Sequence, residues 1–224
     1  MDISKTGIDV SKWQADINWK TVKSATNPPI EYALIKATEG VQTKDSKAQQ
    51  NGLGAKTAGI KFGYYHFARP YLDNAIKSAQ WFAASLKSLP KGEIMPVLDL
   101  ETNDGGLTPA QMQEWVTTFL NTMKSLGYPD VIMYSYKYFL NDNLPKDHPF
   151  GNMPLWLASY TNNPPTPPNG WDGYEIWQYT DKGQVPGITG NVDMNKSDNL
   201  APVLLGISSI IIVGTIALLL FAAK

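Results

Sequence analysis

The chain contains no cysteine, which excludes disulfide bonds and thiolate metal sites. It has only two histidines, His66 and His148, and neither belongs to a closely spaced pair of the kind that binds zinc. The 19 basic and 20 acidic residues nearly cancel, so nothing suggests a general attraction to nucleic acid. We therefore expect no metal, no cofactor and no nucleic-acid partner.

The N-terminal stretch MDISKTGIDVSKWQ lacks the apolar core of a cleavable signal peptide. The other end differs, because residues 201–223 (APVLLGISSIIIVGTIALLLFAA) carry no charge. About 20 apolar residues are enough to cross a bilayer. A buried core helix is the alternative, but a core helix of this length usually has a polar face. We predict a transmembrane helix within a C-terminal segment, 199–224, that follows a folded domain over 1–198.

Short apolar runs alternate with helical patterns along the first 198 residues. Helical spacing follows the second, third and fourth of these runs, over 46–59, 74–89 and 108–127. The loops between the last three runs are too short for full helices. The candidate strands are 7–11, 32–38, 61–67, 94–101, 131–135, 155–160, 174–180 and 191–195.

This alternation predicts an α/β fold with a parallel sheet. Eight strands with helices in the first part favour a closed, TIM-like barrel that is irregular in its last third. An open doubly wound sheet is the alternative. It would normally have a glycine-rich phosphate loop after its first strand, where this chain has KWQADINW.

Acidic residues lie at several predicted strand ends: Asp9, Glu39, Asp99, Glu101 and Asp193. A single acid at such a position is usually a helix cap or a turn former. In parallel barrels, however, the active site lies at the C-terminal ends of the strands. Their convergence on one rim therefore indicates a functional site.

The stretch IMPVLDLE ends an apolar run with two acids. Side chains alternate along a strand, so Asp99 and Glu101 share a face. Repulsion and burial raise the proton affinity of at least one of two close carboxylates. One proton donor beside one charged carboxylate suits the cleavage of glycosidic bonds. A metal site is the competing use of clustered acids, but the chain lacks a suitable histidine pair.

Aromatic residues on the predicted strands support a sugar substrate, because sugar rings stack on aromatic faces. The candidates for substrate binding are Tyr65, Tyr134, Trp156, Tyr160 and Trp177, together with the acid at position 39. Such residues can instead fill the core of a barrel. We place the first three in the predicted cleft.

Eight motifs in order resemble the family 25 glycoside hydrolases, the lysozymes (N-acetylmuramidases) of phage endolysins and bacterial autolysins. The resemblance extends from about Gly7 to Asn195, almost the whole predicted folded domain. The motifs are GIDVSKWQ, ALIKATEG, GYYHFARP, PVLDLE, MYSY, LWLASY, IWQYT and NVDMN.

The resemblance implies a barrel of five strand–helix units followed by three strands, (β/α)5(β)3. It also implies cleavage of the β-1,4 bond between N-acetylmuramic acid and N-acetylglucosamine in peptidoglycan. By the same resemblance Glu101 is the proton donor, and Asp99 is the nucleophile or stabilises a positively charged intermediate. Asp9 and Asp193 are expected to line the site and to orient or tune this pair.

The family's cleft tyrosines match Tyr65 and Tyr134. Family members often carry wall-binding repeats at the C-terminus, where this chain has the apolar stretch. We expect a phage-encoded, membrane-anchored enzyme for lysis or wall penetration. Its partners would be glycan strands, a membrane contacted through 201–223, and other virion proteins. The rivals are a sugar-binding module that has lost catalysis, and a membrane-anchored wall-binding or virion assembly protein with a lysozyme-like domain.

Overall fold

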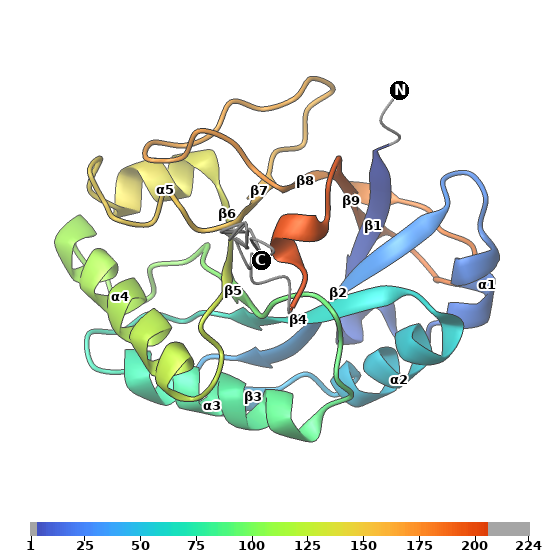
Figure 1. Cartoon of the computed structure of the whole chain (residues 1–224), viewed down its shortest axis with the longest axis horizontal. Helices are drawn as coiled ribbons and strands as arrows, with labels where there is room; N and C mark the ends of the chain where they lie inside the picture. Colours follow the sequence, from blue (N-terminus) through green and yellow to red (C-terminus); the bar gives the residue numbers. More distant parts are fainter. Residues whose placement is uncertain (1–3, 206–224) are drawn as a thin grey trace, which may run out of the picture.

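The computed structural model describes residues 4–205, which form a barrel with helices packed around part of it (Figure 1). All eight predicted strands are present, and a two-residue strand, β3, is added. The strands are β1 (Lys5–Val10), β2 (Ile30–Glu39), β3 (Thr43–Lys44), β4 (Lys61–Phe67), β5 (Val97–Asp99), β6 (Ile132–Tyr136), β7 (Leu155–Ala158), β8 (Ile176–Gly183) and β9 (Val192–Ser197).

The sheet closes because β1 pairs with both β2 and β9. Pairing is parallel from β1 through β2, β4, β5, β6 and β7 to β8. The last strand, β9, is antiparallel to both of its neighbours, β8 and β1. The start of β9 therefore lies at the same rim as the ends of the parallel strands.

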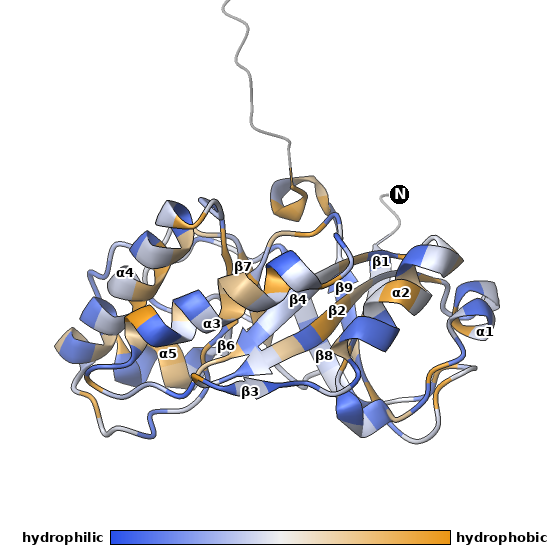
Figure 2. Cartoon of the chain, turned by 90° about the horizontal axis from the view of Figure 1, so that it is seen from below, coloured by the Kyte–Doolittle hydropathy of each residue, from blue (hydrophilic) through white to orange (hydrophobic). Residues whose placement is uncertain are grey.

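A helix follows each of β1, β2, β4, β5 and β6, and none follows β7 or β8. This is the (β/α)5(β)3 order that the resemblance implies. The helices are α1 (Trp19–Ser24), α2 (Ala48–Ala58), α3 (Ala75–Ser88), α4 (Pro109–Ser125) and α5 (Lys137–Asn143). Figure 2 shows both hydrophilic and hydrophobic residues along α3 and α4, as expected for helices that cover one side of a sheet.

Helix α4 begins and ends where its sequence predicts. The Thr108 side chain accepts a hydrogen bond from the Gln111 backbone N–H, and the Gln111 side chain accepts one from the Thr108 backbone N–H, which completes a capping box. Pro109 occupies the first helical position, where its missing N–H costs nothing. Gly127 follows the helix at φ +97°, a conformation that glycine adopts at little cost.

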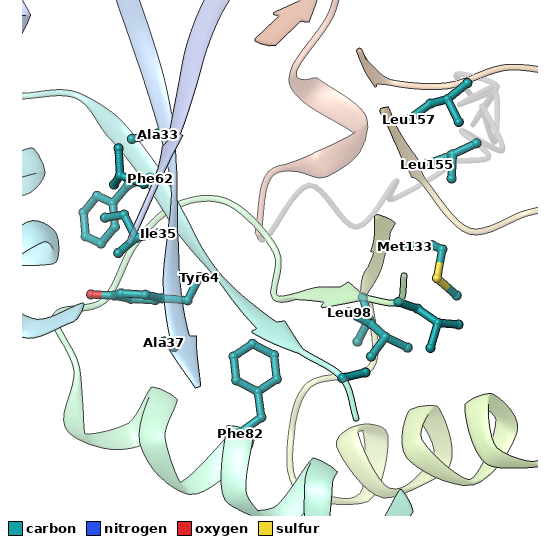
Figure 3. Packing of buried hydrophobic residues seen from close by; sticks show 14 of the residues in the cluster. Ala33, Ile35, Ala37, Phe62, Tyr64, Phe82, Leu98, Met133, Leu155 and Leu157 are labelled. Atoms are coloured by element: carbon teal, nitrogen blue, oxygen red, sulfur yellow. The ribbon is translucent and has the colours of Figure 1, made fainter. Parts of the chain in front are cut away.

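Two apolar layers hold the barrel together. Outward-facing strand residues pack against the helices, and Figure 3 shows this layer with Phe82 of α3 beside the strands. A second cluster fills the barrel interior and includes Tyr32, Leu34, Trp156 and Val203. The site at the rim therefore rests on a filled barrel rather than on an open pore.

Strand β5 is shorter than the predicted run over 94–101. Pro96 has no N–H to donate to a neighbouring strand, and β5 begins only after it. Ile94 and Met95 pair instead with the C-terminal part of the described chain. The bonds are an antiparallel bridge between Ile94 and Leu204, and a 2.9 Å bond from the Met95 N–H to the Val203 carbonyl.

The described chain ends in a short 3-10 helix, η2 (Ala201–Val203), which lies near the centre of the barrel in Figure 1. Leu200 and Val203 are buried in the interior cluster. The packing of the barrel therefore extends to Leu205 and includes the first residues of the predicted membrane segment. The rest of that segment lies outside the described residues. Over 4–205, no helix combines the length and the apolar character that a membrane span needs.

Candidate active site

Four of the predicted acids meet in one hollow of about 220 Å³ at the rim of the barrel. Asp9 of β1 lies directly opposite Asp193 of β9 in the antiparallel ladder. Asp99 is the last residue of β5, and Glu101 follows two residues later. The convergence arises because the parallel strands end, and the antiparallel β9 starts, at this rim.

Two amides hold Asp9 in the floor of this hollow. Its Oδ2 accepts hydrogen bonds from Asn195 Nδ2 at 2.8 Å and from Gln178 Nε2 at 3.0 Å. Asn195 Oδ1 accepts a 2.7 Å bond from the indole N–H of Trp156. An indole nitrogen can only donate, so this bond fixes which end of the Asn195 amide faces Asp9.

Gln178 is fixed in a similar way. Its Oε1 accepts hydrogen bonds from the Tyr134 hydroxyl at 2.9 Å and from the Tyr160 hydroxyl at 3.1 Å. The amide nitrogen of Gln178 is therefore directed at Asp9. Neither Gln178 nor Asn195 was predicted as a site residue. The signal in the sequence is the alternation of each strand. Gln178 comes two residues after the inward Ile176, and Asn195 comes two residues after Asp193, so each amide faces inward as well.

Asp9 and Asp193 form the first acidic pair. Burial, and then the nearby charge of Asp193, raise the pKa of Asp9 well above its ordinary value. Burial also raises the pKa of Asp193, while its hydrogen bond to Asp9 opposes the rise. The pair therefore places less negative charge at the rim than two free carboxylates would.

Replacing Asp9 with Asn should stabilise the fold at neutral pH. The Asn oxygen can accept both amide bonds, and its NH2 can donate to Asp193. An acid whose pKa is raised by folding gives its full stability below the ordinary pKa, and loses it as the pH rises through the raised pKa. We expect a higher melting temperature for Asp9→Asn at pH 7, by about 2–4 °C per kcal/mol gained.

The same comparison at pH 3 should show a much smaller gain, because Asp9 is then protonated in the folded and the unfolded chain. Asp130→Asn, at an exposed position on a loop, is the matched control and should change the melting temperature little at either pH. A lower melting temperature for Asp9→Asn at pH 7 would contradict this account of the acid pair.

Asp99 and Glu101 form the second acidic pair. Burial, and then the charge of Glu101, raise the pKa of Asp99 well above its ordinary value. Burial raises the pKa of Glu101 as well, while the ammonium of Lys36 opposes the rise in both. The buried Oδ1 of Asp99 has no hydrogen-bond partner within residues 4–205. No donor in this part of the chain therefore stabilises charge on that oxygen, which fits the raised pKa of Asp99.

Glu39 is set apart from the other acids. Its carboxylate accepts bonds from Lys36 at 2.7 Å and from Arg69 at 2.8 and 3.0 Å, and it does not line the hollow. Although burial raises the pKa of Glu39, these partners hold it below its ordinary value. We therefore do not place Glu39 in contact with substrate.

Lys36 lines the hollow and was missed in the sequence. Its signal was the alternation of β2, in which Tyr32 and Leu34 face the barrel interior and a lysine comes next on that face. Trp13 also lines the hollow, and 78% of its surface is exposed. It offers an aromatic face at the mouth.

The predicted aromatic residues divide into three groups. Tyr65, Tyr134 and Trp156 line the hollow, as predicted. Tyr160 lines an adjoining groove. Trp177 lines neither the hollow nor the groove. Its indole N–H donates to the Ser159 carbonyl at 2.7 Å, and the ammonium of Lys196 on β9 lies over its ring. Trp177 was misplaced because adjacent residues of a strand face opposite sides.

The adjoining groove has a volume of about 770 Å³ and continues from the hollow, since Glu101 and Tyr134 line both. Its walls come from the end of β6, the start of α5, the end of β7 and the proline-rich loop after it. Among residues 4–205, no three His, Asp or Glu side chains are arranged to hold a metal ion.

A rim with paired carboxylates next to a long aromatic groove is suited to hydrolysing a polysaccharide. The sequence matches the family model "Glycosyl hydrolases family 25" over residues 8–188. The chain belongs to this family. The match includes three of the four clustered acids and ends just before Asp193.

Similar proteins agree with the family. The chain is 36% identical over 211 residues to Lysozyme M1 of Streptomyces globisporus, covering 91% of this chain and 71% of that protein. The structure of a bacterial lysozyme from Streptomyces coelicolor is 34% identical with a TM-score of 0.78, covering 88% of this chain and 93% of that one. A family 25 lysozyme from Aspergillus fumigatus is 30% identical with a TM-score of 0.73, covering 88% and 95%. The protein is a glycoside hydrolase, a lysozyme that acts on peptidoglycan.

Proposed function

We propose that this family 25 enzyme cleaves the β-1,4 bond between N-acetylmuramic acid and N-acetylglucosamine, with Glu101 as the proton donor. The observation that supports this role is the position of Glu101, which lines both the acidic hollow and the aromatic groove. A glycosidic oxygen at that boundary would join one ring in the hollow to the rest of the strand in the groove. The raised pKa of Glu101 keeps a proton available above the ordinary range of a carboxyl group.

Asp99 would either stabilise the positive charge that develops on the muramic acid ring or attack the anomeric carbon as the nucleophile. Its place beside Glu101 in the lining of the hollow supports either role. Direct attack needs two carboxyl groups about 5–5.5 Å apart. Glu101 lies two residues beyond Asp99, the end of β5, and extended backbone would place the two roughly 6.5 Å apart. The proposal therefore includes both direct attack by Asp99 and attack by the substrate's own acetamido group.

In the second step, Glu101 would remove a proton from water, and that water would complete hydrolysis with retention of configuration. Asp9 and Asp193 would orient the ring from the opposite wall of the hollow. The raised pKa of Asp9 limits the negative charge on that wall, and Asp99 and Glu101 line the other side of the hollow.

The products of wall digestion test this function. We expect purified peptidoglycan incubated with the protein to release fragments with new reducing ends on N-acetylmuramic acid, identified by borohydride reduction and mass spectrometry. New reducing ends on N-acetylglucosamine, or free peptides without new reducing ends, would contradict the proposal.

We propose in addition that a membrane holds the enzyme near the wall through residues 201–223, and that its origin is a phage that uses it for lysis or wall penetration, alongside other virion proteins. The support is the uncharged run in the sequence, which is long enough to cross a bilayer. The first residues of this run pack on the barrel, so the 18 uncharged residues 206–223 are left for the span.

Two truncations should separate the fold from this segment. A chain that ends at Leu205 keeps η2 and should cleave isolated walls at the full rate. A chain that ends at Asp198 loses the buried Leu200 and Val203, and we expect its free energy of unfolding to fall by about 3–6 kcal/mol. Urea unfolding followed by fluorescence measures the difference. Equal stability of the two chains would show that η2 does not contribute to the fold.

A further inference from the structure

The hollow and the groove accept different parts of one substrate. The hollow holds the carboxylates that stabilise positive charge, so it takes the ring on which that charge develops. Glu101 lies at the junction, and a leaving oxygen protonated there belongs to the saccharide beyond it. The larger groove therefore takes the leaving side of the glycan.

The walls of the groove are aromatic and exposed. Tyr136, Tyr138 and Tyr160 have 38%, 76% and 54% of their surfaces exposed, and all three line this one groove. Exposed apolar residues that gather in a groove often mark a binding site. Pro164 and Pro165 of the proline-rich loop form the facing wall. Flat apolar faces of this kind bind sugar rings but do not read charge.

Charge in the groove comes from two residues. Among the residues that line it, Lys137 is the one cation, and Glu101 is the one acid. The Nζ of Lys137 donates a 2.6 Å hydrogen bond to Thr166 Oγ1, which holds the ammonium against the proline-rich loop. Within residues 4–205 Lys137 forms no ion pair, and its Nζ makes one hydrogen bond, so two of its three N–H donors have no partner there.

Peptidoglycan offers a matching group. Every second sugar of the strand is a muramic acid, which carries a lactyl ether that ends in a carboxylate or continues into a peptide with carboxylates of its own. We propose that Lys137 binds a carboxylate of the wall polymer on the leaving side of the scissile bond, so that it selects acidic muramic-acid strands over neutral glycans. This inference rests on the proposed function, because it assumes that the groove holds the leaving side.

Binding to three soluble strands tests the proposal. The protein carries Glu101→Gln to prevent turnover, and tryptophan fluorescence reports binding. The strands are peptide-bearing glycan, glycan freed of its peptides by an amidase, and the latter with its carboxylates converted to neutral methylamides. Lys137→Met is compared with Lys137→Arg, and with Lys124→Met at the far end of α4 as the matched control.

We expect Lys137→Met to raise Kd about fivefold for an acidic strand, the upper range for a partly exposed ion pair, and to leave the neutral strand unchanged. Lys137→Arg should restore most of the affinity, and Lys124→Met should have no effect. The difference should shrink at high ionic strength. If Lys137→Met weakens binding of the peptide-free strand, Lys137 binds the lactyl carboxylate. If it weakens binding of the peptide-bearing strand alone, Lys137 binds a carboxylate of the peptide.

An equal loss on the neutral strand would mean that Lys137 only supports the loop through Thr166, and no loss on either acidic strand would remove Lys137 from recognition. Both results overturn the inference. The chain with native Lys137 and Glu101 is assayed on whole walls in parallel. If it cleaves walls, a negative binding result counts against Lys137 alone; if it does not, the proposed function fails as well.

Discussion

Replacing Glu101 with Gln should lower the rate of wall cleavage by about 10²–10⁴-fold, the usual contribution of a general acid. Gln has nearly the shape of Glu but cannot donate an acidic proton to the leaving oxygen. Glu101 makes no ion pair within residues 4–205, so the change removes no partner from the fold. The decrease in turbidity of a wall suspension measures the rate.

The matched control is Glu114→Gln on the exposed face of α4, which should keep the full rate. Near-ultraviolet circular dichroism should show the same aromatic packing in both variants. Clearing of walls by Glu101→Gln at the normal rate would exclude Glu101 as the proton donor, whatever the geometry of the rim.

The pH profile of the unaltered enzyme follows from the same group. Glu101 must be protonated to act, and its pKa lies above the ordinary value for a carboxyl group because it is partly buried. Activity should therefore persist above the ordinary carboxyl range and fall as the pH rises through the raised pKa. The charges of Lys36 and Arg69 favour the ionised form of Glu101, so they oppose the rise in its pKa.

The barrel could be predicted because its signals are local. Apolar runs alternate with helical spacing, and Thr108, Pro109 and Gly127 mark the ends of one helix in the sequence itself. The convergence of the acids also followed from general geometry, since the ends of parallel strands meet at one rim. The antiparallel β9 brings Asp193 to that rim, which strand order along the sequence does not reveal.

The partners of the acids could not be predicted in the same way. From the chemistry of their side chains we predict that Trp177 and Glu39 bind substrate. In the structure Gln178 and Lys36 line the hollow, and Trp177 and Glu39 do not. The error at Trp177 concerns which side of its strand the residue faces. The error at Glu39 concerns which cations lie close to its carboxylate. Arg69 reaches Glu39 from the loop after β4, a contact that neither spacing nor composition contains.

The C-terminal turn illustrates a different limit. The apolar character of residues 200–205 fits a membrane segment and a buried plug equally well by hydropathy alone. Only the structure shows Leu200 and Val203 in the barrel interior, where the Val203 carbonyl accepts a hydrogen bond from the Met95 N–H. The sequence could not reveal this use, because the cavity that receives the turn is formed by strands distant in the chain.

Asp99→Asn should produce the second large loss of activity, about 10²–10³-fold, which is typical when one group that stabilises transition-state charge is removed. Stability should change in the opposite direction. Burial and the charge of Glu101 raise the pKa of Asp99 in the folded chain, so the unaltered protein loses stability as the pH rises through that pKa. Asn carries no charge to bury, and the melting temperature of the variant should be higher at pH 7.

This opposite change separates a functional acid from a structural one. If Asp99 held the fold together, its replacement would lower activity and stability together, and that result would remove it from the mechanism. Asp99→Ala with added azide then distinguishes the two forms of attack. Azide can take the place of a missing nucleophile and give an α-glycosyl azide, so its recovery would identify direct attack by Asp99. With attack by the substrate's acetamido group the β configuration is retained, and no α-azide should form.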